Sequence, residues 1–229
     1  MNALVDYRNV PHGIRTRGLR YLTDRIATHV AQLEPNTRTL GVRLYSGWDK
    51  GRVLTQEAQR LEAEKNNSFP TIRQGNVPLT ISLELAQNIQ AVPRKTLFNK
   101  LRLEPIRNGI RFKKPSDTTC RNARCPIDNL YDFFRDGHCP LTGCAGTVAA
   151  LADQEQQKLV DTMLVADMIH TAYQGNDPIC LVGSDDDMWP GLLSVLALGR
   201  TVIHLETKAA LMQSPYFMPN LGTYIQRVL

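Results

Sequence analysis

Apolar residues along the chain follow two different spacings, which predicts strands alternating with helices. Short apolar runs, or alternating apolar and polar residues, occupy 3–5, 39–45, 80–85, 179–182 and 201–205. Apolar residues three or four apart, the helical spacing, occupy 14–33, 50–65, 154–173 and 189–198. Two basic segments, 97–103 and 109–112, are expected to be strand-like. The order of these elements indicates an α/β protein.

The clearest order of elements lies between residues 179 and 205. An apolar strand ends at Val182, an acidic turn follows at 185–187, and a helix from about Trp189 ends before Gly199. A β-branched strand comes next, so this segment predicts the strand–helix–strand unit of a parallel sheet. We therefore expect a central, mainly parallel sheet with helices on its faces.

Length and composition are those of an ordinary globular protein. The chain has 229 residues, of which 42% are hydrophobic and 21% charged, and this suits one α/β domain with an insertion. No run approaches the roughly 20 apolar residues that span a bilayer, and the N-terminus has no signal-peptide pattern. The sequence therefore predicts a soluble, cytoplasmic protein with no membrane partner.

Basic residues are concentrated in two parts of the chain. The formal net charge is +5 and the isoelectric point is about 9.0, which fits either a nucleic-acid partner or a solvated basic surface. Clusters of basic residues bind phosphate backbones. The N-terminal group consists of Arg8, Arg15, Arg17, Arg20 and Arg25, and the middle group of Arg94, Lys95, Lys100, Arg102, Arg107, Arg111, Lys113 and Lys114.

Aspartates follow two of the predicted strands. Asp6 ends the first strand, and the acidic turn 185–187 follows another, so both are expected at the carboxyl edge of a parallel sheet. Carboxylates gathered there repel one another unless a cation lies between them, and oxygen ligands favour Mg²⁺ or Mn²⁺ over Zn²⁺. The alternative for the turn is helix capping, which one of its aspartates is expected to provide.

Two further aspartates lie on the helix predicted over 154–173. Asp161 and Asp167 are six residues apart, which places them roughly 120° apart around a regular helix. Both therefore cannot point into one small site. Asp161 is closer to the helix start and so to the expected crevice, which makes it the preferred ligand. Asp167 is expected to be a surface or salt-bridged residue.

Several short motifs, in order along the chain, resemble those of NYN domains. Leu4-Val5-Asp6-Tyr7-Arg8-Asn9 is similar to the opening strand of that family. Lys158-Leu159-Val160-Asp161 resembles its lysine-x-valine-aspartate helix, and Leu181-Val182-Gly183-Ser184-Asp185-Asp186-Asp187 resembles its leucine-valine-serine-glycine-aspartate-x-aspartate turn. Gly199-Arg200-Thr201-Val202 fits its glycine-basic-x-valine strand. The departures are the exchanged order of Gly183 and Ser184 and the additional Asp186.

The resemblance implies a single NYN domain over 1–229 with the three-layer, PIN-like (Rossmannoid) α/β fold. It also implies a metal-dependent ribonuclease, an endonuclease that hydrolyses RNA phosphodiesters with Mg²⁺ or Mn²⁺ and without a side-chain nucleophile. The implied metal ligands are Asp6, Asp161, Asp185 and Asp187, with Asn9 beside them and with Arg8, Arg15 and Arg17 on the RNA backbone. The departures leave open which of Asp185, Asp186 and Asp187 is the direct ligand.

Other functions fit the same residues. One alternative is a catalytically weak RNA-binding or adaptor module of the same fold, and another is a metal-dependent phosphatase or nucleotidase. The basic clusters favour a polymeric substrate over a small phosphoester. The sequence is also compatible with a homo-oligomer or with a protein partner.

Residues 115–146 differ in character and are expected to form a small Cys-rich insertion. The sequence contains five cysteines, and four of them stand there as two pairs with the same inner spacing: Cys120, Cys125, Cys139 and Cys144. Paired thiolates of this kind can hold one structural Zn²⁺. Free thiols or disulfides are the alternatives, and His138 could replace one ligand.

A few other residues have both a functional and a structural interpretation. Trp48 and Trp189 could stack on nucleic-acid bases, whereas packing in the core is at least as well supported for Trp189. Cys180 lies in a predicted core strand and is expected to be a small buried hydrophobic residue.

Overall fold

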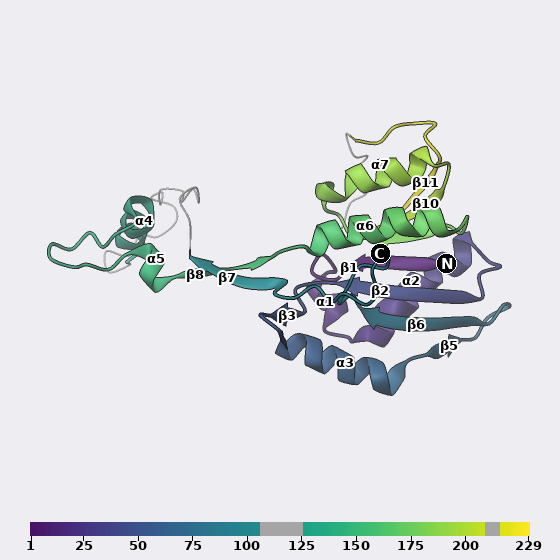
Figure 1. Ribbon diagram of the computed structural model, residues 1–229, viewed down its shortest axis with the longest axis horizontal. Helices are drawn as coiled ribbons and strands as arrows, with labels where there is room; N and C mark the ends of the chain where they lie inside the picture. The colour runs from purple at the N-terminus through teal and green to yellow at the C-terminus, as the bar shows by residue number, and fades with distance from the viewer. Residues whose placement is uncertain (106–125, 209–215) are drawn as a thin grey trace. The chain divides into compact units, whose positions relative to one another are not determined.

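The computed structural model describes residues 1–105, 126–208 and 216–229 (Figure 1). These residues belong to two compact units. The first unit consists of Met1–Leu101 and Gln157–Leu229, and the second of Arg102–Gln156. The segment 109–112 and the residues Cys120 and Cys125 lie outside the described residues. None of the helices described is long and apolar enough to cross a membrane.

A seven-stranded sheet forms the centre of the first unit, in the order β11-β10-β9-β1-β2-β6-β5. Every neighbouring pair is parallel except β5 and β6. The strands are β1 Asn2–Asp6, β2 Thr39–Tyr45, β5 Thr71–Arg73, β6 Leu79–Leu85, β9 Ile179–Val182, β10 Thr201–Glu206 and β11 Thr223–Val228. The expected mainly parallel sheet is therefore confirmed. The two edge strands, β5 and β11, were not predicted.

Helices cover both faces of this sheet, which makes the first unit a three-layer α/β structure (Figure 1). The main helices are α2 Leu19–Leu33, α3 Gln56–Ser68, α6 Val160–Gln174 and α7 Trp189–Ala197. Alternate residues of β1 face opposite layers: Val5 packs in the same cluster as Ile26 of α2, and Leu4 packs with Leu164 of α6. Strands β1 and β9 are buried on both faces, so Ala3-Leu4-Val5 and the whole of β9 are apolar.

Helices α6 and α7 pack closely on one face of the sheet, and Gly191 is the residue that permits it. A Cβ atom at Gly191 would lie 2.6 Å from the Met168 side chain and 2.9 Å from that of Val165. A larger residue would therefore force the two helices apart. Asp161 lies in the first turn of helix α6, and helix α7 follows the acidic turn, so both helices begin near the acidic residues.

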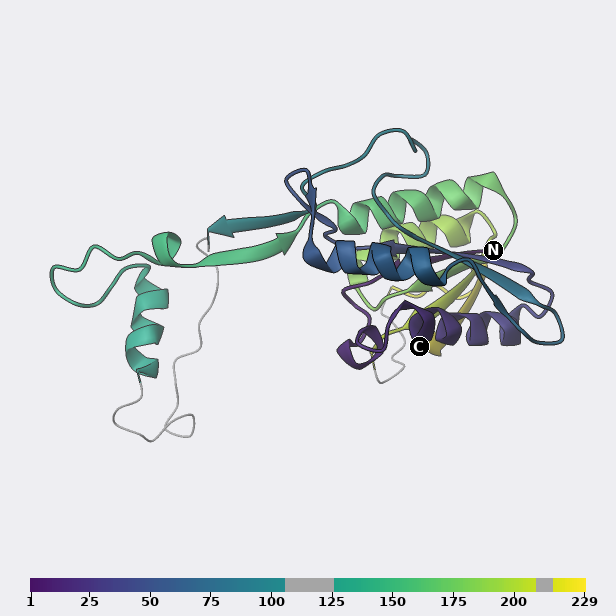
Figure 2. The same cartoon turned by 90° about the horizontal axis from the view of Figure 1, so that it is seen from below.

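The helix predicted over 14–33 is divided into α1, His12–Arg15, and α2 (Figure 2). Gly18 separates them with a φ of +93°, a left-handed conformation that favours glycine. The side chain of Glu64, from α3, accepts a hydrogen bond from the backbone N–H of Leu19. The start of α2 is thus set by a residue far away in the sequence, and the continuous helix was wrong for that reason.

Other predicted helix starts were also wrong. Residues 50–54 belong to a hairpin of β3, Asp49–Lys50, and β4, Val53–Leu54, and α3 begins after Thr55, which caps it. The helix runs on to Ser68, beyond the predicted end at residue 65. In the same way, residues 154–157 belong to β8, Asp153–Gln157, and α6 begins only after Leu159, whose φ is +69°. By contrast, α7 and its stop at Gly199, with a φ of +72°, are confirmed.

The second unit contains a two-stranded sheet and two helices. Strand β7, Leu101–Pro105, pairs with β8, and the helices are α4 Ile127–Asp136 and α5 Val148–Leu151. Helix α4 lies inside the expected Cys-rich insertion, 115–146, in which no helix was predicted. It ends at Gly137, which adopts the left-handed conformation of a helix C-terminus. Leu130, Phe133 and Phe134 follow the helical spacing, so the sequence contained a signal for this helix that was overlooked.

Candidate functional site

The sheet changes direction between β1 and β9. From β1 the chain continues through β2 to β6 on one side, whereas β9 leads to β10 and β11 on the other. In parallel sheets such a switch point leaves a crevice at the carboxyl ends of the strands. Asp6 is the last residue of β1, and Asp185 lies in the turn after β9. The first-turn residue of α6 is Asp161.

Asp6 is held in a fixed orientation by Asn9. Its carboxylate accepts hydrogen bonds from the Asn9 side-chain amide and, at 3.4 Å, from the Asn9 backbone N–H. Burial raises the pKa of Asp6, because only 3% of the residue is exposed, while the Asn9 hydrogen bonds lower it and the charge of Asp185 raises it. The structure therefore brings Asn9 and Asp6 together as one polar unit.

In the acidic turn after β9, one aspartate caps a short helix and the other two are exposed. Asp185 accepts a hydrogen bond from the backbone N–H of Asp187 at 3.2 Å and so caps a short 3₁₀ turn, Asp186–Met188, that leads into α7. Asp186 and Asp187 are exposed. The expected capping role thus belongs to Asp185. That role fixes the orientation of its carboxylate.

Asp161 is electrostatically coupled to the aspartates at the strand ends. Burial, followed by the charges of Asp6, Asp185 and Asp187, raises its pKa to about 6. All the charged groups that shift this pKa are carboxylates. The predicted acidic residues therefore lie within one another's field, and that field is not offset at Asp161.

This group has the chemistry of a divalent-cation site. Carboxylate oxygens are the ligands that Mg²⁺ and Mn²⁺ prefer, and a cation would relieve the repulsion that raises the pKa of Asp161. Within the described parts of the chain, no three Asp, Glu, His or Cys side chains lie close enough to form a metal site. Asp6 and Asp185 are instead engaged with Asn9 and with the backbone of Asp187.

A pocket of about 910 Å³ opens beside the acidic residues, between α6 and α7. Its acidic end is formed by Asp161, Asp186 and Asp187. Its remaining walls are mostly apolar and come from Thr162, Val165, Ala166, Ile169, Trp189, Pro190, Leu193 and Tyr216. Such a pocket suits a ligand with a flat apolar part and a group that reaches the carboxylates.

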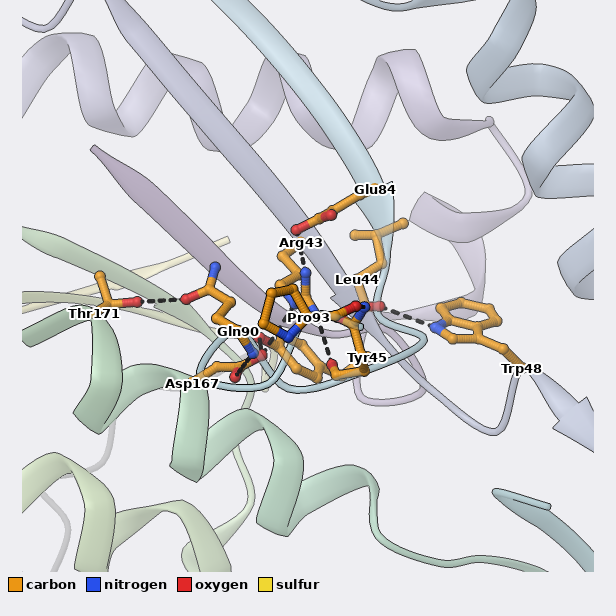
Figure 3. A network of polar contacts seen from close by, with 10 residues as sticks. Arg43, Leu44, Tyr45, Trp48, Glu84, Gln90, Pro93, Asp167 and Thr171 are labelled. Atoms are coloured by element: carbon orange, nitrogen blue, oxygen red, sulfur yellow. Dashed lines mark hydrogen bonds and ion pairs between the residues drawn. The ribbon is translucent and has the colours of Figure 1, made fainter. Parts of the chain in front are cut away.

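Asp167, the other acidic residue of α6, has a structural role (Figure 3). It is fully buried and accepts hydrogen bonds from the Tyr45 hydroxyl at 2.7 Å and the Gln90 backbone N–H at 2.6 Å. Arg43 Nε lies 3.0 Å from the same carboxylate, as an ion pair rather than an aligned hydrogen bond. Of the two expectations for Asp167, the salt bridge is confirmed and the surface position is wrong.

Several described residues of the predicted basic clusters already have partners within the fold. The guanidinium groups of Arg8 and Arg15 lie 3.7 and 3.8 Å from the carboxylate of Glu57, whereas the Arg17 guanidinium lies 3.8 Å from the centre of the Tyr21 ring. Lys100, from the middle cluster, is buried. It forms an ion pair with Asp49, so it cannot contact nucleic acid in this fold.

The two tryptophans belong to the core. Trp48 is fully buried, and its indole N–H donates a hydrogen bond to the Leu44 carbonyl at 3.0 Å. Trp189 is 4% exposed. Base stacking by Trp48 is therefore wrong, and core packing of Trp189 is confirmed. Cys180 is also fully buried, which raises its pKa to about 12, so its interpretation as a buried hydrophobic residue is confirmed.

Sequence reasoning missed a polar network that supports the acidic turn. The Ser184 hydroxyl donates to the carboxylate of Glu206, and His204 Nε2 lies 2.9 Å from the Gly183 carbonyl oxygen. Burial lowers the pKa of His204, so the ring is neutral and donates from Nε2. These contacts hold the end of β9 immediately before Asp185. His204 and Glu206, two polar residues at alternate positions of an otherwise apolar strand, could have indicated this network.

In the second unit, the described cysteines of the predicted zinc set lie together. The Cys144 thiol is hydrogen-bonded to the Gly146 backbone and to Cys139, and these contacts lower its pKa. Cys139 and Cys144 are both free of disulfide bonds. A lowered thiol pKa favours the thiolate form that binds metal ions.

Comparisons of the chain with models of protein families, with curated proteins and with solved structures found no match. The function is therefore inferred from the residues and geometry of this chain.

Proposed function

We propose that this protein is a metal-dependent endoribonuclease in which Asp6, Asp161, Asp185 and Asp187 hold Mg²⁺ or Mn²⁺. The observation that carries the proposal is the environment of Asp161. Its pKa is raised to about 6 by burial and by the charges of three other aspartates at the switch point of a parallel sheet. Uncompensated carboxylates at such an edge are typical of a cation site.

The residues around this site have distinct roles in the proposal. Asn9 orients Asp6, and the capping bond orients Asp185, so these carboxylates are fixed before a cation arrives. Asp161 and Asp187 complete the ligand set, with Asp186 as the alternative to Asp187. A divalent cation held by these carboxylates would supply a water of lowered pKa and would offset negative charge on the phosphate. No side chain is needed as the nucleophile.

The substrate class follows from the pocket and from the motif resemblance. The apolar walls formed by α6 and α7 suit a nucleobase next to the phosphate that reaches the carboxylates. The ordered motifs around Asp6, Asp161 and Asp185 resemble NYN domains, which favours a PIN-like nuclease and RNA over DNA. The three-layer α/β architecture is compatible with that fold.

We further propose that Cys120, Cys125, Cys139 and Cys144 bind a structural Zn²⁺. The support comes from the contact between the Cys139 and Cys144 thiols and from the lowered pKa of Cys144. A bound ion would stabilise this segment by linking the two cysteine pairs.

Nuclease assays with matched variants test the main proposal. Labelled single-stranded RNA, single-stranded DNA and a small phosphoester are incubated with Mg²⁺ or Mn²⁺ and the wild type, Asp6→Asn or Asp185→Asn. We expect RNA cleavage that falls about 100-fold or more in both variants, as for loss of one electrostatic group in a catalytic site. Asp177→Asn is the control, because its side chain is 81% exposed and pairs only with the N-terminal amine among the described residues.

The other outcomes separate the alternatives. Absence of RNA cleavage by the wild type with either metal would contradict the enzyme proposal, and RNA binding that persists would then favour an adaptor. Hydrolysis of the small phosphoester without RNA cleavage would favour a phosphatase. An independent readout is the melting temperature, which Mn²⁺ should raise in the wild type and less in Asp185→Asn.

A further inference from the structure

Helix α2 has a row of basic and aromatic side chains along one side. Arg17 precedes the helix, and Tyr21, Arg25 and His29 follow at intervals of four residues. Four residues advance a helix by about 6 Å, so Tyr21, Arg25 and His29 extend over roughly 12 Å along α2, and Arg17 lies just before its start. The apolar residues of α2 occupy another side and are buried against the sheet.

Tyr21 holds the arginines of this row in place. The Arg17 guanidinium lies 3.8 Å from the centre of the Tyr21 ring, which is a cation–π contact. On the other side, Arg25 Nη1 lies 3.5 Å from the Tyr21 hydroxyl. The row is therefore an ordered arrangement in which an aromatic ring separates two positive charges.

Positive charge along this row is not neutralised. Among the described residues, no carboxylate forms an ion pair with Arg17 or Arg25, and Asp24, the single carboxylate of α2, forms none with them. Arg25 Nε is buried and has no hydrogen-bond partner. Burial, followed by the charges of Arg25 and Arg227, lowers the pKa of His29. The Arg227 side chain, from β11, thus adds to the same positive field.

We propose that Arg17, Tyr21, Arg25, His29 and Arg227 form a track that binds the phosphate backbone of a single-stranded nucleic acid. Guanidinium groups match phosphate oxygens in geometry, and an aromatic side chain among them offers a face or edge to a base. Arg17, Arg25 and Arg227 form no ion pair with a described carboxylate, and several such cations fit a polymer with regularly repeated charges better than a single anion. The choice of RNA as the polymer rests on the proposed nuclease function.

Binding measurements without cleavage test this track. The affinity of the full-length protein for a labelled single-stranded oligouridine is measured at several salt concentrations, without added divalent cation. The test variant is Arg17→Gln/Arg25→Gln/Arg227→Gln. Each lost phosphate contact lowers the salt-dependence slope by about 0.7 for a single strand, so we expect a decrease of about 2 and at least tenfold weaker binding.

A matched variant controls for net charge. Arg60→Gln/Lys65→Gln/Arg135→Gln removes the same number of positive charges, but each of these residues is already paired with a carboxylate. We expect this control to bind RNA like the wild type. If the triple variant does not fold, Arg17→Gln alone is the substitute, because Arg17 is exposed and lies outside the helix.

The other outcomes of the binding measurements also test the proposed track. Equal binding by the test and control variants would overturn the track. Equally tight binding of polyglutamate or of phosphatidylserine vesicles, lost in the same variant, would identify a general anion surface and overturn the nucleic-acid proposal. Because cleavage is measured separately, loss of binding in a protein that never cleaves RNA would support the track and contradict the nuclease.

Discussion

At the scale of single residues, Asp161 links the charge of the site to the stability of the protein. Its pKa is about 6 in the folded chain and 3.8 in the ordinary, unperturbed state. The folded protein therefore holds this proton more tightly than the unfolded protein does. Its favourable contribution is present when the carboxyl group is protonated, and stability falls as the pH rises from about 4 through about 6.

Asp161→Asn removes this titration. We expect the variant to melt at a higher temperature than the wild type near pH 7 and at about the same temperature near pH 4, without added divalent cation. Thermal denaturation across this pH range measures the difference. Asp177→Asn should follow the wild type, since Asp177 is exposed. A variant whose advantage grows toward low pH would contradict the assigned sign.

At the scale of elements, the buried network around Arg43 joins three parts of the first unit (Figure 3). Arg43 and Tyr45 belong to β2, Asp167 to α6, and Gln90 to the segment that follows β6. The Arg43 guanidinium also pairs with Glu84 of β6. A single buried carboxylate thus connects a helix to the sheet and to a long connecting segment.

Asp167→Asn should strongly destabilise the protein because it removes the buried counter-charge of Arg43 and leaves only the half-exposed Glu84 paired with that guanidinium. Removing one partner of a buried ion pair costs about 3–5 kcal/mol. Glu84→Gln is the matched comparison on the same guanidinium. The Glu84 side chain is 55% exposed, so its loss should cost about 1 kcal/mol or less. Urea denaturation measures the free energy of unfolding of both variants. An equal loss of stability in the two would contradict the larger contribution assigned to the buried Arg43–Asp167 pair.

At the scale of the whole molecule, the second unit tests whether the cysteine pairs form one metal site. We expect purified protein to contain about one zinc per chain, and Cys139→Ser/Cys144→Ser to lose it. Elemental analysis by mass spectrometry measures the content. Cys180→Ala is the control, because Cys180 is buried in the first unit and should not affect zinc. A wild type without zinc, or a double variant that keeps it, contradicts the proposed site.

The amino-acid order was sufficient for the α/β class and for the central strands. β1, β2, β6, β9 and β10 are apolar or alternate clearly because their neighbours bury them, and this leaves a local pattern. The order of strands and acidic turns was also sufficient to propose that Asp6 and Asp185 share one edge. Helix geometry separated Asp161 from Asp167 for the same reason, since it depends only on residue spacing.

Contacts between residues distant in sequence explain the features that the pattern of apolar and polar residues did not predict. Glu64 accepts a hydrogen bond from Leu19 at the start of α2. Asp167 forms a buried ion pair with Arg43, and Lys100 forms one with Asp49. The two residues of each pair are distant in sequence. Edge strands β5 and β11 were missed because their residues are at most half-buried, which leaves a weak apolar pattern. The tertiary structure determines which residue pairs with a charge, caps a helix or covers a side chain. The pairing of Arg8 and Arg15 with Glu57, and the exposed row beginning at Arg17, therefore became visible only once the chain was folded.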